Sequence, residues 1–150
     1  MTLTKILGLA YRNYNRDGQS DFYYENALRD IAVIELLFAT GLIVSELCNI
    51  KQNDINLKEK YIKVYGKGAK ERYIQLTNSN VISALKKYQS KFLLEIKNTN
   101  NYFINNRGNK LSEKSVRIIV NKFAKLCESD IHITPYMFSI LLQHYFERKM

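Results

Sequence analysis

The sequence predicts one domain that is mainly α-helical and carries a small antiparallel β-hairpin or sheet. Its 150 residues include one proline and six glycines, so few positions interrupt regular structure. Apolar residues recur at helical spacing between Leu28 and Leu37, whereas two β-rich runs flank a glycine-containing turn near residue 67. A chain of this length can bury a single hydrophobic core, so we treat residues 1–150 as one domain.

The N-terminal half is expected to be helical. We predict a helix over residues 3–14, a polar loop over 15–20 and a longer helix that begins near Glu25. This helix should end at Thr40, because Gly41 suits the left-handed position that follows many helices. A short second helix is expected over residues 44–50.

The period of the pattern then changes from helical to extended. Residues 61–65 and 73–76 are β-rich, and Gly66 and Gly68 lie in the turn between them, which is typical of a β-hairpin. A capping stretch at 77–80 precedes a predicted helix over 81–96. We expect a short strand at 102–104 and a turn at 106–109.

Two further helices complete the chain. Ser112 and Ser115 form a partial capping box for a helix that runs to about Cys127. Thr134 is the expected N-cap of the last helix, with Pro135 at its first position.

Composition limits the possible functions. The net charge of +9 favours a polyanionic partner such as nucleic acid, although the lysines could equally serve only to solvate the surface. Cys48 and Cys127 lack any CxxC spacing, so we expect two buried free thiols in a cytoplasmic protein, with no metal site and no cofactor. No apolar run reaches the roughly 18 residues of a membrane-spanning helix.

Six short segments stand out by their order and spacing: residues 36–42 (LLFATGL), 45–47 (SEL), 54–57 (DINL), 66–72 (GKGAKER), 102–108 (YFINNRG) and 133–135 (ITP). Taken together, they resemble the catalytic domain of tyrosine recombinases, the phage integrase family. The resemblance extends from about Ala27 to the C-terminus. It implies a tyrosine recombinase catalytic-domain fold and a role in DNA integration and recombination, as in mobile genetic elements and phages.

Most catalytic positions that the resemblance implies are substituted. In this family a tyrosine attacks a DNA phosphodiester without a metal, two arginines bind the phosphate, histidines assist, and a hairpin lysine protonates the leaving oxygen. The first arginine position holds Ile43, the first histidine Tyr136, the second arginine Ser139 and the adjacent histidine Ile140. Only the lysine, Lys67, is retained. We therefore expect a pseudoenzyme that neither cuts nor joins DNA.

The resemblance also suggests consequences for the C-terminal region. The family's nucleophilic tyrosine would lie well beyond Ser139, whereas the sequence stops at Met150, so we expect a C-terminally truncated domain. We expect Ile43 and Ile140 to fill part of the former phosphate pocket. The last helix is expected to form a homodimer through its apolar residues, which are Phe138, Leu141, Leu142, Tyr145 and Phe146.

The DNA contacts are expected on the hairpin, at Lys67, Lys70 and Arg72, and on a helix, at Lys114 and Arg117. The hairpin charges either contact phosphates or are merely solvated. Such contacts predict weak, sequence-independent DNA binding. Two alternatives stay open: a remnant or interaction module that pairs with itself or with intact recombinases, and an enzyme that uses other residues.

Overall fold

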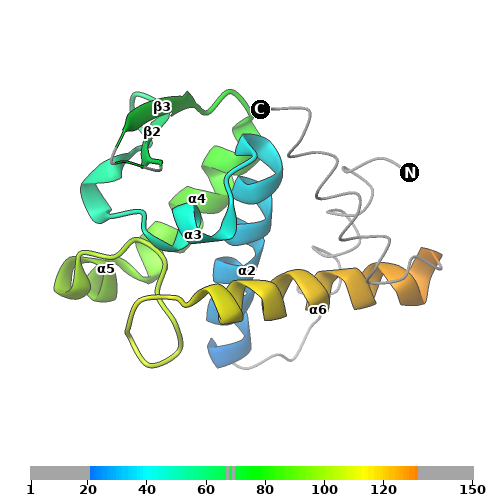
Figure 1. The fold of residues 1–150 in the computed structure, drawn as a ribbon. Helices are drawn as coiled ribbons and strands as arrows, with labels where there is room; N and C mark the ends of the chain where they lie inside the picture. The colour runs from blue at the N-terminus through cyan, green and yellow to red at the C-terminus, as the bar shows by residue number, and fades with distance from the viewer. Residues whose placement is uncertain (1–20, 67, 69, 132–150) are drawn as a thin grey trace.

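A computed structural model describes residues 21–66, 68 and 70–131 of the chain. Figure 1 shows mainly helices beside one small sheet, which confirms the predicted fold class. The elements are α2 (Asp21–Thr40), α3 (Val44–Cys48), the 3-10 helix η1 (Gln52–Asp54), β1 (Ile55–Asn56), β2 (Tyr61–Tyr65), β3 (Glu71–Gln75), α4 (Ser79–Lys91), α5 (Leu93–Thr99) and α6 (Glu113–Ile131).

Helix α2 forms the centre of the core. All residues from 31 to 38 are buried, so the helix is covered on all sides rather than along one stripe. It packs against α4 and α6, and in Figure 1 it stands upright between α4 and the long α6. The helix ends as predicted: Gly41 has a φ of 70° and its N–H donates to the carbonyl of Leu37 at 3.1 Å.

The sheet has three antiparallel strands in the order β1-β2-β3. Lys63 pairs with Tyr73 and Val64 pairs with Arg72 across β2 and β3, which confirms the hairpin. Alternation in β2 buries Ile62 and Val64 on the face toward the core. Strand β1 was not predicted, and β3 begins at Glu71 rather than at residue 73.

One predicted helix is divided in the structure. The single helix expected over 81–96 is two helices, α4 and α5, because the backbone leaves helical geometry at Phe92 (φ −104°, ψ 18°). Asn78, in the predicted capping stretch, accepts a hydrogen bond from the N–H of Asn80 at 2.8 Å and so caps α4.

Residues 102–104 do not form the expected strand. Their backbone hydrogen bonds go to separate partners: Tyr102 N–H donates to the Ile50 carbonyl at 2.9 Å, and Ile104 N–H donates to the Tyr88 hydroxyl at 2.9 Å. The strand pairing of residues 102–104 is limited to one isolated bridge, between Ile104 and Lys110. The segment is fully buried, which explains its strand-like apolar composition.

Some predictions fall outside the described residues. These are the helices over 3–14 and from Thr134, the residues Lys67, Tyr136, Ser139 and Ile140, and the contact proposed for the C-terminal helix. Within the described part, no helix has the length and apolar character needed to cross a membrane. The same part holds no group of three potential metal ligands among His, Cys, Asp and Glu.

Candidate nucleic-acid interface

Ile43 lies at the start of α3 with its side chain 51% exposed. The expectation that Ile43 and Ile140 together fill part of a former phosphate pocket is therefore not met at Ile43, and Ile140 lies outside the described residues. The cause is local, since Ile43 is the extended N-cap residue of α3 (φ −78°, ψ 158°) and its neighbour Leu42 is fully buried. Side chains of adjacent extended residues point in opposite directions, so Ile43 faces outward.

Three hydrogen bonds meet at the carboxylate of Glu46, one turn into α3. Its Oε1 accepts from the backbone N–H of Ile43 at 3.2 Å and from Arg72 Nη2 at 3.1 Å. Its Oε2 accepts from Arg72 Nη1 at 2.7 Å. Arg72 projects from the inner side of β3, so this pair joins the hairpin to the beginning of α3.

Glu46 and Arg72 each stabilise the charged form of the other. Partial burial raises the pKa of Glu46, but the hydrogen bonds from Arg72 and Ile43, together with the charge of Arg72, lower it below its ordinary value. The hydrogen bond to Glu46 raises the pKa of Arg72. The Glu46 side chain is 11% exposed and that of Arg72 is 47% exposed. Since a guanidinium has five N–H groups, its exposed edge can still meet a phosphate.

The described residues of the hairpin turn are Gly66, Gly68 and Lys70. Gly66 N–H donates to the Lys70 carbonyl at 2.9 Å, and Gly68 has a φ of 77° that favours glycine. A Cβ on Gly66 would lie 3.5 Å from Arg72 Nη1, which is an ordinary van der Waals contact, so the guanidinium packs directly beside this end of the turn. The side chain of Lys70 is exposed. The backbone hydrogen bond thus holds the two ends of the turn together, and Lys70 faces the solvent.

The predicted cations of α6 also lie on the surface. Lys114 and Arg117 are both exposed in the first turns of the helix, and Arg117 Nη2 lies 3.6 Å from Glu113 Oε1. Ser112 accepts a hydrogen bond from Ser115 N–H at 3.1 Å, as the partial capping box predicts. Because α3 contacts α6 and the hairpin is paired to α3, the two basic segments border α3 on different sides (Figure 1).

A hollow of about 310 Å³ lies where α3 meets the start of α6. Lys110 Nζ donates to Asn49 Oδ1 at 2.5 Å on its wall. The thiol of Cys48 also lines the hollow; burial raises its pKa to about 11, so it is a protonated thiol at neutral pH. This agrees with the prediction that Cys48 is a buried free thiol, while the side chain of Cys127 lies outside the described residues.

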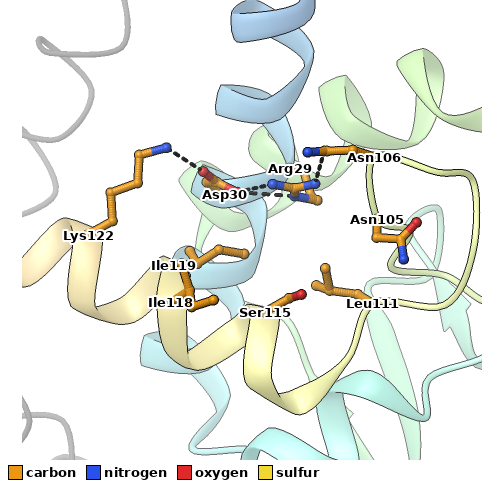
Figure 2. Close-up of a pocket in the computed structure, with 9 residues that line it drawn as sticks. All are labelled: Arg29, Asp30, Asn105, Asn106, Leu111, Ser115, Ile118, Ile119 and Lys122. Atoms are coloured by element: carbon orange, nitrogen blue, oxygen red, sulfur yellow. Dashed lines mark hydrogen bonds and ion pairs between the residues drawn. The ribbon is translucent and has the colours of Figure 1, made fainter.

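A second hollow, of about 200 Å³, contains a buried ion pair that sequence reasoning missed (Figure 2). Arg29 donates from Nε and Nη2 to Asp30 Oδ1 at 3.1 and 2.9 Å, and from Nη1 to Asn106 Oδ1 at 2.7 Å. Lys122 Nζ reaches Asp30 Oδ2 at 3.3 Å. These bonds fasten α2 to the 105–111 loop and to α6, so the network positions the helices.

Comparison with known proteins identifies the family. Residues 19–149 match the family model described as "Phage integrase family". A tyrosine recombinase of Agathobacter rectalis is 48% identical over 120 residues, which is 80% of this chain and 39% of that protein. The tyrosine recombinase XerC of Bacillus subtilis is 37% identical over 123 residues, or 79% of this chain and 39% of that protein. The chain therefore belongs to the phage integrase family, whose members act in DNA recombination.

Solved structures share the fold. The XerA recombinase has a TM-score of 0.69 at 21% identity, covering 97% of this chain and 46% of that chain. The XerH site-specific recombinase bound to a palindromic difH substrate also has a TM-score of 0.69, at 20% identity, covering 97% of this chain and 40% of that chain. The chain spans about two fifths of the length of the curated relatives it matches.

Proposed function

We propose that this chain is a DNA-binding domain that holds the phosphate backbone without cutting it. The proposal rests on the residues at the start of α3. Glu46 and Arg72 form an ion pair there, but Ile43, at the position that the family resemblance assigns to the first arginine, is a half-exposed isoleucine. We take this pair as part of a former phosphate site, in which Ile43 stands at the position that the family resemblance assigns to one of two phosphate-binding arginines.

DNA binding is supported by charge and by the relatives. Lys70, Arg72 and Lys114 are exposed cations on two segments that border α3. Two structurally similar proteins were solved with DNA, the XerH recombinase with difH substrate and the lambda integrase with a Holliday junction. Contacts through lysine and arginine to phosphates carry no sequence information, so we expect binding that is weak and independent of sequence.

We expect no cleavage because of the negative charge that develops on the phosphate during the reaction. A phosphoryl transition state gains negative charge on its nonbridging oxygens, and one missing donor at such a site typically costs about 3–4 kcal/mol. Ile43 cannot supply a donor, and the resemblance assigns Ser139 to the second arginine position. Arg72 lies near the start of α3, but it is not a free replacement for the missing arginine, because Nη1 and Nη2 each already donate a hydrogen bond to Glu46.

A covalent-trapping assay tests this part of the proposal. The full chain is incubated with a nicked suicide duplex and resolved under denaturing conditions, with an intact recombinase as the positive control. We expect no protein–DNA adduct. An adduct that disappears when one tyrosine is changed to phenylalanine would show that the chain is an active enzyme.

An interaction module is the second candidate function. Two large apolar side chains support it, since Ile118 on α6 is 57% exposed and Leu94 on α5 is 68% exposed. A module of this kind would associate with itself or with an intact recombinase and would show no salt-dependent binding to DNA. Sedimentation of the chain alone, and mixed with an intact relative, distinguishes this candidate from the first.

A further inference from the structure

The sheet carries an exposed aromatic surface on the side away from Arg72. Strand pairing places partners on the same face, so this outer face is opposite to buried Ile62 and Val64. Its members are Tyr61, Lys63, Tyr65, Glu71, Tyr73 and Gln75. Tyr65 is 46% exposed and Tyr73 is 63% exposed, so their rings are open to solvent.

The rings of the outer face are held by their neighbours. Tyr61 and Tyr73 meet edge to face, with ring centroids 5.6 Å apart and an interplanar angle of 69°. Lys63 Nζ lies 5.3 Å from the centroid of the Tyr65 ring. Side chains that are ordered in advance lose less conformational entropy when they bind a ligand.

Exposed lysines lie beyond both ends of the outer face. Lys58 and Lys60 are in the β1–β2 turn, and Lys70 follows the β2–β3 turn. None of these three makes an ion pair with another residue of the described part. The one carboxylate on the face, Glu71, lies 3.3 Å from Lys63 and is thereby compensated.

We propose that the outer face binds single-stranded DNA, with unpaired bases stacked on Tyr65 and Tyr73 and the phosphates near the flanking lysines. Aromatic rings between cations suit a single strand, because every unpaired base offers a π-face and every nucleotide a negative charge. The five residues of β2 span about 14 Å. With its flanking turns the face can hold roughly four nucleotides, the short end of the site sizes of single-strand binders.

This site goes beyond the duplex contacts proposed above, and Lys70 is the one residue that both proposals use. In a duplex the bases are stacked on one another and cannot lie on the tyrosines. The phosphate contacts proposed for Arg72 would be on the inner side of β3, opposite to this face. A protein partner could also bury tyrosines. The exposed lysines at both ends of the face favour single-stranded DNA over a protein partner, because DNA carries a negative charge on every nucleotide.

Fluorescence anisotropy with labelled oligo(dT) tests the proposal on the full chain. Changing both Tyr65→Ala and Tyr73→Ala should weaken binding by roughly 10-fold or more, because stacking on each ring is lost. The double change to phenylalanine keeps both π-faces and should bind within about 3-fold of the parent. Leu94→Ala, at an equally exposed apolar position on α5, is the matched control and should have no effect. Far-UV circular dichroism of each variant checks that the fold is kept.

Duplex binding is measured on the same variants to separate this site from the proposed function. The alanine double variant should retain the duplex affinity of the parent. If the parent protein binds oligo(dT) through the tyrosines but does not bind duplex DNA, only the duplex proposal is rejected. Oligo(dT) binding that is absent in the parent, or equal in the parent and the alanine variant, would overturn the single-strand site. Tyrosine-dependent self-association without oligo(dT) binding would assign the face to a second copy of the chain instead.

Discussion

Arg72 and Glu46, 26 positions apart in the sequence, form a two-point ion pair with N···O distances of 2.7 and 3.1 Å. The same carboxylate accepts the backbone N–H of Ile43 at 3.2 Å. One glutamate thus fixes both the β-hairpin and the first residue of the α3 segment. The placement of the cationic turn relative to Ile43 depends on this residue.

A double-mutant cycle should show that the pair is coupled. Removing either charge, with Glu46→Gln or Arg72→Gln, and then both should give a coupling free energy of about 0.5–1 kcal/mol in urea unfolding. The value is modest because Arg72 is 47% exposed. The exposed Glu113–Arg117 pair, with an N···O distance of 3.6 Å, is the control and should couple by about 0.3–0.5 kcal/mol or less. Additive effects at Glu46 and Arg72 would contradict the pairing.

The contribution of Glu46 should depend on pH. Its pKa is lower in the folded protein than the ordinary value of 4.5, so its stabilisation is present above about pH 4.5 and is lost as pH falls through the folded pKa. The difference in unfolding free energy between the parent and Glu46→Gln should therefore be constant from pH 6 to 8. It should shrink toward zero in acid. A difference that grows as the pH is lowered would contradict the assigned direction.

An arginine at position 43 should be tolerated. Ile43 is half exposed and lies next to the carboxylate of Glu46, so Ile43→Arg should change the free energy of unfolding by no more than about 0.5 kcal/mol. The neighbouring Leu42→Arg is the control and should destabilise severely, because that side chain is fully buried. Equal losses from both substitutions, measured by chemical denaturation, would mean that Ile43 is buried after all.

The hydroxyl of Tyr88 should be important for stability. It donates to the Tyr102 carbonyl at 2.6 Å and accepts from Ile104 N–H at 2.9 Å inside the core. Tyr88→Phe leaves two buried backbone groups without this partner and should cost about 1–3 kcal/mol. Tyr102→Phe removes only a partly buried bond to Gln89 at 3.1 Å and should cost less. The reverse order of the two costs would contradict this account.

Local signals in the sequence predicted much of the fold. The helical spacing of Leu28 to Leu37, the glycine at position 41 and the turn glycines at 66 and 68 each act within a few residues, and each gave the element found. The break at Phe92 and the irregular path of residues 102–104 were missed. Both depend on burial against distant parts of the chain, to which local periodicity is insensitive.

The candidate site was only partly predictable. The exposed positions of Lys70, Lys114 and Arg117 agree with their expected surface placement, although their contact with DNA stays a prediction. The pairing of Arg72 with Glu46 had no sequence signal, because it needs the register of β3 and the position of α3 together. The hydrogen bonds of Arg29 and Asp30 were not predicted for the same reason. Their partners lie far along the chain, in the 105–111 loop and in α6.

The salt dependence of duplex binding tests the central claim most directly. About three to five phosphate contacts predict that log K falls with log salt at a slope of about −3 to −5. Changing Lys67 and Lys70 together to alanine should shallow the slope by about one to two units. Lys86 and Lys87, exposed on α4, are the matched control pair and should leave it unchanged. A parent protein without salt-dependent binding, or equal losses in both double variants, would contradict DNA binding by the hairpin.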